Sequence, residues 1–285
     1  MPFITTDDDV SLHYTDWGRG QPVVLIHGWP LDSRMWEYQA CALVDAGYRV
    51  IAYDRRGFGR SDHADGGYDY DRLADDLDTL IRRLDLKNCA LVGFSMGAGE
   101  VARYLSRHGD TRIDRVTLLA GVTPCLVQGP DNPNGTPRGV FDGLAQALSD
   151  DRIGFLAGYA QTVFRADADP TICAGMKAWY LSMAFQASKR ATEATARAWS
   201  GADFRADMAA FTRPTLILHG GQDQSAPPQI TGRAAAAAIP GARYVEYADA
   251  HHFIVVDERR NVLADLLAFL GESEATGLHE GLNDS

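Results

Sequence analysis

A serine in the middle of the chain has surroundings that suit a nucleophile. Ser95 is the central residue of Gly93-Phe-Ser-Met-Gly97, which follows an apolar run and precedes apolar residues at helical spacing. This pattern predicts a strand, a sharp turn and a helix, with the serine held in a strained conformation on the turn. Glycine is needed on both sides because a Cβ there would collide with the neighbouring strand or helix. The N–H groups at the start of the helix suit a developing oxyanion.

A serine hydroxyl is a poor nucleophile at neutral pH, so a base and an orienting acid must come from elsewhere in the chain. Sheet hydrolases with this turn carry the nucleophile, the acid and the histidine in that order. Asp223 stands in a turn after an apolar run that ends at His219, and His252 follows the last predicted strand. We therefore predict Ser95 as nucleophile, Asp223 as orienting acid and His252 as base. The adjacent His251 is a rival for the role of base.

Two other interpretations compete for these residues. Gly97-Ala-Gly-Glu-Val-Ala102 also matches a degenerate dinucleotide-binding fingerprint. That motif needs an acidic residue at the end of the next strand, where this chain has Gly121-Val-Thr-Pro124. His251 and His252 could form a metal pair, but adjacent residues rarely chelate one ion and Asp249 alone is a weak third ligand. We expect neither a nucleotide cofactor nor a metal.

Length and composition favour one large α/β domain and exclude several classes of protein. The chain has 285 residues, is 46% hydrophobic and carries a formal net charge of −11. The absence of basic runs argues against a nucleic-acid partner, and the absence of long apolar runs argues against a membrane partner. The acidic N-terminal segment is unlike a signal peptide. We predict a soluble, cytoplasmic protein that acts on a small molecule; a homo-oligomer is compatible with the sequence. The four cysteines lack metal or redox spacing and are expected to be buried thiols.

Strands and helices alternate along most of the chain. Residues 3–5 and 11–16 alternate apolar and polar side chains around an acidic turn and predict an antiparallel hairpin at a sheet edge. Further strands are predicted at 22–26, 49–53, 90–92, 115–120, 214–218 and 243–247, and helices at 35–46, 70–84, 228–239 and 258–270, with one more from Met96. This order predicts a mostly parallel sheet covered on both faces, with ligands at the carboxyl ends of its strands. The polar residues at those ends are His27, Asp54, Ser95, Asp223 and His252.

One segment, residues 125–213, interrupts the alternation. It begins with a stretch rich in proline, glycine and asparagine and continues as helical, aromatic-rich sequence. We predict a helical cap inserted into a core made of residues 1–124 and 214–270. Most of its aromatic side chains should pack together, and a minority should line a pocket. Residues 271–285 lack periodic apolar positions and are expected to be disordered.

Several motifs together resemble the α/β-hydrolase superfamily. More narrowly, they are similar to the branch of cofactor-free haloperoxidases, also called perhydrolases or non-haem chloroperoxidases, with their aryl-esterase and γ-lactamase relatives. The motifs are His27-Gly-Trp-Pro-Leu31, Tyr53-Asp-Arg-Arg-Gly-Phe-Gly-Arg-Ser61, Gly93-Phe-Ser-Met-Gly97, Gly99-Glu-Val-Ala-Arg-Tyr104, Asp203-Phe-Arg-Ala-Asp207 and Leu218-His-Gly-Gly-Gln-Asp223. The resemblance spans residues 3–270 and implies an eight-stranded, mostly parallel sheet with an inserted helical cap.

The resemblance implies the same triad as the spacing does. Ser95 would be the nucleophile, His252 the base and Asp223 the orienting acid, with the backbone N–H groups of Trp29 and Met96 as the oxyanion hole. It implies no cofactor: neither haem nor metal is required. In this family His27 is structural, and the turn from Asp54 to Ser61 is also expected to be structural.

The resemblance also suggests substrate-binding positions, namely Trp29, Pro30, Val122, Leu126 and Leu144. In the similar perhydrolases the carbonyl between the tryptophan and the proline is thought to accept a hydrogen bond from peroxide. The last three positions are aliphatic where relatives often carry phenylalanine, so the substrate of a relative does not transfer safely to this chain. A second departure is that Phe253 follows the catalytic histidine where the family usually has glycine.

The leading hypothesis is a serine hydrolase that forms an acyl-enzyme from a small carboxylic ester. Water would release the acid, or hydrogen peroxide would release a peracid that can oxidise halide. The first alternative is a lactonase or γ-lactamase with the same triad. A second alternative, from a different class, is a non-catalytic ligand receptor on the same fold.

Overall fold

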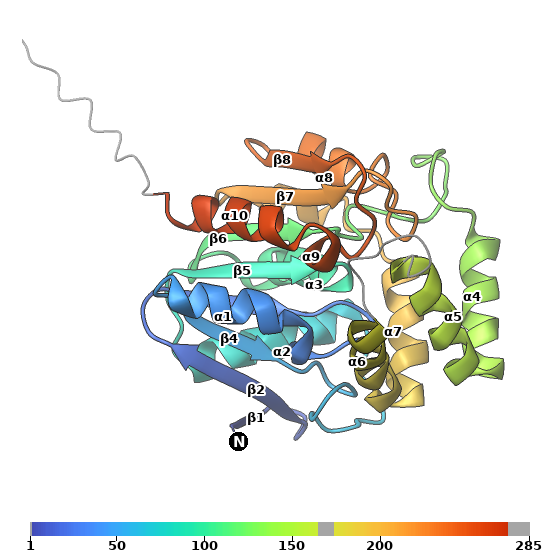
Figure 1. Ribbon diagram of the computed structural model, residues 1–285, viewed down its shortest axis with the longest axis horizontal. Coiled ribbons are helices and arrows are strands. Elements are labelled where there is room, and N and C mark those ends of the chain that lie inside the picture. The colour runs from blue at the N-terminus through green and yellow to red at the C-terminus, as the bar shows by residue number, and fades with distance from the viewer. Residues whose placement is uncertain (1, 165–173, 273–285) are drawn as a thin grey trace, which may run out of the picture.

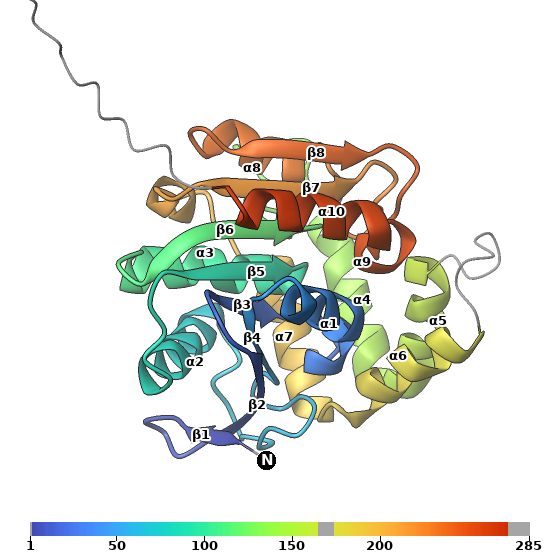
Figure 2. The same ribbon diagram turned by 60° about the vertical axis from the view of Figure 1, so that its left-hand side comes forward.

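The computed structural model describes residues 2–164 and 174–272, which form one eight-stranded sheet with helices on both faces (Figures 1 and 2). The strands are β1 (Phe3–Thr5), β2 (Ser11–Gly18), β3 (Pro22–Ile26), β4 (Arg49–Tyr53), β5 (Cys89–Phe94), β6 (Ile113–Leu119), β7 (Thr215–Gly220) and β8 (Arg243–Tyr247). Their order in the sheet is β1-β2-β4-β3-β5-β6-β7-β8. β1 and β2 form an antiparallel hairpin and β2 pairs antiparallel with β4, while the other neighbouring pairs are parallel. The predicted fold class and its edge hairpin are confirmed.

Helices follow most of the strands. They are η1 (Ser33–Trp36), α1 (Glu37–Asp45), α2 (Tyr70–Arg83), α3 (Met96–His108), α4 (Arg138–Asp150), α5 (Arg152–Phe164), α6 (Ala174–Gln186), α7 (Lys189–Gly201), η2 (Asp207–Ala210), α8 (Gly232–Ala238), α9 (Ile254–Asp257) and α10 (Arg259–Leu270). α1 and α10 cover one face of the sheet, and α2 and α3 cover the other (Figure 1). No helix within the described ranges is both long and apolar enough to span a bilayer.

The central strands are buried on both faces, which explains their continuous apolar sequence. In β3, Val24 and Ile26 pack into the cluster under α2 and α3, while Val23 and Leu25 pack into the cluster under α1 and α10. Successive side chains of a strand point to opposite faces, so one strand serves both clusters. All four side chains are fully buried. The strand ends are thereby held rigidly, which a site built on them requires.

Helix α2 shows how local sequence sets one of the covering helices. The carboxylate of Asp69 accepts a hydrogen bond from the backbone N–H of Arg72, 3.0 Å away, and so caps the helix. Leu73, Leu77 and Leu80 recur at helical spacing and are fully buried. The predicted span of 70–84 therefore agrees with the observed helix to within one residue.

Two other predicted helices differ at their first residues. The helix expected at 35–46 is divided into η1 and α1, because the Asp32 carboxylate caps a short 3₁₀ turn first. The helix expected from residue 228 begins only at Gly232, because Thr231 has a non-helical backbone. The helix expected at 258–270 agrees with α10 to within one residue, whereas the single turn α9 before it was not predicted. Cys41 is exposed rather than buried, since it lies on the outer side of α1; Cys89 and Cys125 are buried.

The helices α4 to α7 lie between β6 and β7 in the chain. Figure 1 shows them on the side toward which the arrowheads of β5 and β7 point. The division into a core and a cap at residues 125–213 remains our proposal. Of the predicted tail, residues 273–285 lie outside the described residues, whereas the Glu272 carboxylate forms an ion pair with Arg243 at 2.5 Å.

Candidate active site

Ser95 occupies the turn between β5 and α3 in the strained conformation that the sequence predicts. Its φ of 54° and ψ of −116° are unusual for a residue with a side chain. Its backbone N–H donates to the carbonyl of Leu119 on the neighbouring β6 at 2.8 Å, and its carbonyl accepts from Ala98 N at 3.0 Å. These bonds hold the strained turn in place.

The two glycines of the motif are there because backbone crowds them. A Cβ on Gly93 would lie 2.6 Å from the carbonyl oxygen of Gly97, and a Cβ on Gly97 would lie 2.4 Å from the carbonyl oxygen of Ile26. Real Cβ atoms essentially never approach backbone so closely. The G-x-S-x-G spacing therefore reflects how tightly α3 packs on β3 and β5.

We expect Gly97→Ala to destabilise the protein strongly, because its Cβ meets the backbone of Ile26 and His27 rather than a movable side chain. Overpacking of this kind costs about 2–3 kcal/mol of unfolding free energy or more. Gly143→Ala is the matched control: it lies in α4 with nothing within 4 Å of its Cβ and should gain about 0.5–1 kcal/mol. Urea denaturation compares the two variants, and equal stabilities would contradict this packing.

The side chains of Ser95, His252 and Asp223 form a continuous hydrogen-bonded chain. His252 Nε2 lies 2.8 Å from Ser95 Oγ, and His252 Nδ1 lies 2.7 Å from Asp223 Oδ2. All three residues are buried. Because the Asp223 carboxylate accepts the Nδ1 proton, Nε2 is left free to accept the proton of the serine hydroxyl.

The carboxylate of Asp223 is held by both of its oxygens. Oδ1 accepts hydrogen bonds from the backbone N–H groups of Ser225 and Ala226, at 2.9 and 2.8 Å. Oδ2 faces His252 and also lies 3.2 Å from Nε2 of His219. Burial opposes the charge of Asp223, but the histidines at Oδ2 outweigh burial and hold the pKa of this carboxyl well below its usual value. Asp223 is therefore ionised at neutral pH.

His252 is the histidine that joins the serine to the aspartate. Its ring packs against Phe94, the residue before the serine, with ring centroids 5.2 Å apart. Phe253 also packs on Phe94, at 5.3 Å. The backbone N–H of His251 instead faces the Asp257 carboxylate of α9 at 3.4 Å. The last residue of the short helix α9 thus contacts the backbone of the residue before the base.

The two predicted oxyanion donors flank the serine. Met96 is the first residue of α3, where an N–H has no partner within the helix. Trp29 follows Gly28, whose Cβ would lie 3.2 Å from Cβ of Ser95, so the loop after β3 runs beside the serine. The peptide bond between Trp29 and Pro30 is cis.

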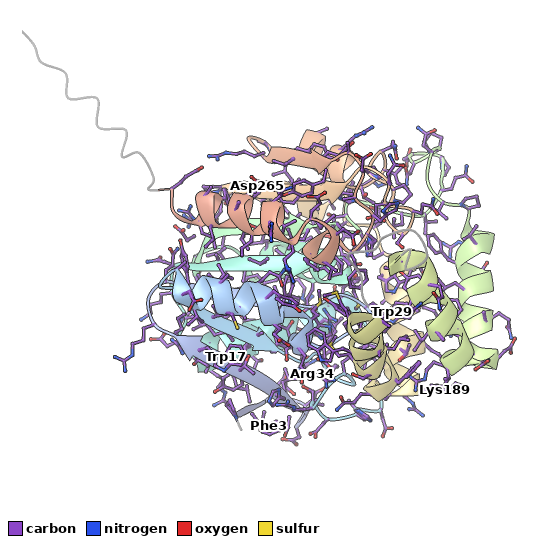
Figure 3. The ribbon with its side chains drawn as sticks, viewed as in Figure 1. Phe3, Trp17, Trp29, Arg34, Lys189 and Asp265 are labelled. Carbon is purple, nitrogen blue, oxygen red and sulfur yellow. The ribbon has the colours of Figure 1, made fainter. Side chains whose placement is uncertain are left out.

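The side chain of Trp29 connects the loop after β3 to helices α5 and α7. Its Nε1–H donates to the carbonyl of Thr192 on α7 at 3.0 Å. Its ring packs against Tyr159 of α5 and Trp199 of α7, with centroids 5.5 and 5.8 Å apart. Figure 3 shows Trp29 where the sheet meets these helices.

A narrow apolar pocket lies near the triad, reached through Phe253, which follows His252, although none of the three triad residues lines it. It is lined by Trp29, Pro30, Leu31, Leu156, Tyr159, Ala160, Val163, Tyr180, Leu181, Ala184 and Phe253. Of the predicted substrate-binding residues, Trp29 and Pro30 line it, whereas Val122, Leu126 and Leu144 are not among its described lining residues. Val122 and Leu126 are buried in the apolar cluster under α2 and α3, and Leu144 packs against that cluster.

Three aromatic residues of the pocket were not predicted as substrate-binding: Tyr159, Tyr180 and Phe253. Tyr159 and Tyr180 belong to the aromatic-rich segment, but nothing in their spacing separates them from packing residues such as Phe141. Burial raises the pKa of Tyr159 to about 12, so its hydroxyl is neutral near the pocket. Of these residues, only Phe253 had a signal in the sequence for its place in the pocket, because it directly follows the base His252.

Two polar residues at strand ends serve the surrounding loops instead of the triad. His27 is fully buried; it receives the backbone N–H of Arg55 at Nε2 (3.0 Å), and its Nδ1 contacts Gly28 O (2.9 Å). Burial and then the nearby Arg55 guanidinium lower the pKa of His27 to about 3. The Asp54 carboxylate contacts His13 Nδ1 at 3.1 Å and accepts from Ser33 N at 2.8 Å.

Comparison with known proteins agrees with this architecture. The alpha/beta hydrolase fold family matches residues 21–259. The chain is 41% identical to the non-heme chloroperoxidase CPO-A1 of Kitasatospora aureofaciens, over 95% of this chain and 100% of that protein. It is 34% identical to the bifunctional esterase/perhydrolase DCH of Acinetobacter calcoaceticus, over 95% of this chain and 99% of that protein.

A solved structure shows the same fold. The bromoperoxidase of Bacillus anthracis superimposes with a TM-score of 0.92 at 38% identity, over 95% of this chain and 99% of that chain. The match therefore includes the sheet, the helices between β6 and β7, and the site residues that precede and follow those helices in the chain. The chain belongs to the α/β-hydrolase family, in the branch that contains the non-haem haloperoxidases and esterases.

Proposed function

We propose that this protein is a serine hydrolase that cleaves small carboxylic esters through an acyl-enzyme on Ser95. The observation that carries the proposal is the hydrogen-bonded chain from Ser95 Oγ through His252 to Asp223, with contacts of 2.8 and 2.7 Å. A nucleophile, a base and an orienting carboxylate in this arrangement are suited to acyl transfer.

In the first half of the reaction, Ser95 Oγ attacks the ester carbonyl while His252 Nε2 takes its proton. The tetrahedral oxyanion accepts hydrogen bonds from the N–H groups of Trp29 and Met96. When the intermediate collapses, the alkoxide or phenoxide leaves with the proton from His252, and the acyl group stays on Ser95. Asp223 stabilises the imidazolium that forms in between.

In the second half, His252 takes a proton from water, and the hydroxide attacks the acyl-enzyme. When the second tetrahedral intermediate collapses, its bond to Ser95 Oγ breaks, His252 returns the proton to that oxygen, and the acid is released. The narrow pocket beside His252 is apolar, and Trp29, Tyr159 and Phe253 form its walls. It suits a short, uncharged acyl or alcohol group.

Hydrogen peroxide can replace water in the second half. The product is then a peracid, which oxidises halide outside the site without haem or metal. Support for this activity comes from two relatives, one named an esterase/perhydrolase and the other a chloroperoxidase. In this chain the carbonyl of Trp29 would accept a hydrogen bond from the peroxide, and Pro30 restricts the backbone around that carbonyl.

We expect Pro30→Leu to lower peracid formation while hydrolysis of a small aryl ester holds or rises. Without the ring of proline the carbonyl of Trp29 gains freedom, and a precisely placed acceptor for peroxide is lost. Peracid formation and ester hydrolysis are measured on the same enzyme sample. If both rates change by the same factor, Pro30 is merely structural and the protein is better described as a plain esterase.

The proposed function itself is tested by titration with a chromogenic organophosphonate. A serine hydrolase loses activity as Ser95 takes up one equivalent of phosphonate per chain. A ligand receptor on this fold takes up no label. A panel of esters, lactones and amides, each with and without peroxide, then separates the esterase from a lactonase or γ-lactamase. Preference for lactones over open esters would move the proposal to the lactonase.

A further inference from the structure

A second histidine lies against the carboxylate of the triad. His219 is in β7 and is fully buried. Its Nε2 is 2.8 Å from the carbonyl oxygen of Ala226 and 3.2 Å from Asp223 Oδ2, the same oxygen that contacts His252. Two imidazoles therefore contact the same carboxylate oxygen. His219 precedes β8 in the chain, and His252 follows it.

The neighbours of His219 determine which of its nitrogens carries the proton. The two nearest neighbours of Nε2 are acceptors, a carbonyl and a carboxylate, and the Thr231 hydroxyl lies farther away at 3.5 Å, so Nε2 is the donor. Nδ1 is buried and has no hydrogen-bond partner among the described residues. It lies against Gly232, where an added Cβ would be 2.6 Å away, so the site has no room for a partner. The N–H on Nε2 of His219 thus points at the carbonyl of Ala226 and the carboxylate of Asp223.

We propose that His219 is a positioning residue that limits the negative charge which Asp223 presents to His252. The proposal rests on the function proposed above. The Nε2–H of His219 withdraws charge from Asp223 Oδ2, and so weakens the attraction of this oxygen for the protonated form of His252. The base is then neutral, and active, down to a lower pH than the carboxylate alone would allow.

Other ionisable groups near this cluster are already neutralised or held away by their own partners. Glu246 of β8 is paired with Arg233 of α8 at 2.6 Å and accepts a hydrogen bond from Tyr244, whose ring lies beside Gly232. On the other side, the hydroxyl of Tyr159 of α5 contacts Ser225 at 3.4 Å. Asp257 of α9 faces the backbone of His251. Among the described residues, the side chains that contact Oδ2 of Asp223 are therefore those of His219 and His252.

The test compares two substitutions of His219 by their pH profiles. His219→Leu removes the N–H, and we expect the acidic limb of kcat/KM for an aryl ester to move upward by about 0.5–1 pH unit. His219→Gln keeps an N–H donor at a similar reach and should restore the wild-type limb. The rate of organophosphonate labelling, measured over the same pH range, reports the same limb without reference to a substrate. His219→Ala replaces the leucine variant if the latter does not fold.

Thr231→Val is the matched control for a purely structural effect. The Thr231 hydroxyl donates to the carbonyls of Ala226 and Pro227 and lies 3.5 Å from His219 Nε2, so it tethers the same loop and ring without touching Asp223. This variant should lower the melting temperature and leave the midpoint of the acidic limb in place.

The outcomes separate the two proposals. Failure of the wild-type protein to take up phosphonate would overturn the proposed function. Stoichiometric labelling, with the same acidic midpoint in His219→Leu and His219→Gln, would overturn only the role of His219.

Discussion

Replacing Ser95 by alanine is expected to lower kcat/KM for an aryl ester by about four to six orders of magnitude. The substitution removes the atom that forms the acyl-enzyme, and the oxyanion donors alone leave only a small residual rate. It removes little packing volume, because the hydroxyl is the only group lost. Ester turnover and thermal unfolding, measured on the same preparation, give the two readouts.

A second buried serine provides the control. Ser200 lies in α7 and donates to the carbonyl of Arg197 at 3.4 Å, away from the triad. Ser200→Ala should keep the activity of the parent. Ser95→Ala with activity within tenfold of the parent would overturn the assignment of the nucleophile.

The second large effect is expected at His252. His252→Ala should lower kcat/KM by a similar number of orders of magnitude, because the serine then has no base and the charge of Asp223 has no partner. His251→Ala should lower kcat/KM by less than about tenfold. Of the two histidine rings, that of His252 is the one in contact with Ser95 and Asp223. Both variants are assayed with the same ester across a range of pH.

This adjacent pair is a strict test of the geometry. The two alanine variants differ by one position in the chain and lose the same number of atoms. If His251→Ala were the inactive variant, the path of the chain between β8 and α9 would be wrong, and the triad would have to be rebuilt around the other ring.

The nucleophile and the sheet could be predicted from the sequence because both depend on local patterns. Gly93 and Gly97 are required by backbone atoms a few ångströms away, and that requirement is visible as a fixed spacing around Ser95. Strands buried on both faces are visible as short apolar runs such as that of β3. In such cases the residue type reports its surroundings directly.

Features that depend on packing between distant segments could not be predicted in this way. The contact of His219 with Asp223 depends on the path of a tight turn and on the positions of Ala226 and Gly232 around it. The walls of the pocket depend on how α5 and α6 are rotated about their axes, so Tyr159 and Tyr180 had no signature of their own. The single turn α9 was likewise not predicted, because four residues are too few to show a helical period.

The helices α4 to α7 leave the sheet after β6 and return at β7, and these two strands are hydrogen-bonded neighbours, with Leu119 beside Leu218. The sheet thus fixes where the segment between β6 and β7 begins and ends, whatever its length or sequence. Closing a longer excursion costs only about 0.6 kcal/mol for each doubling of its length. Over evolution, this segment can therefore be lengthened, shortened or replaced as a module, and substrate range can diverge between lineages while the strand ends that carry the chemistry stay in place.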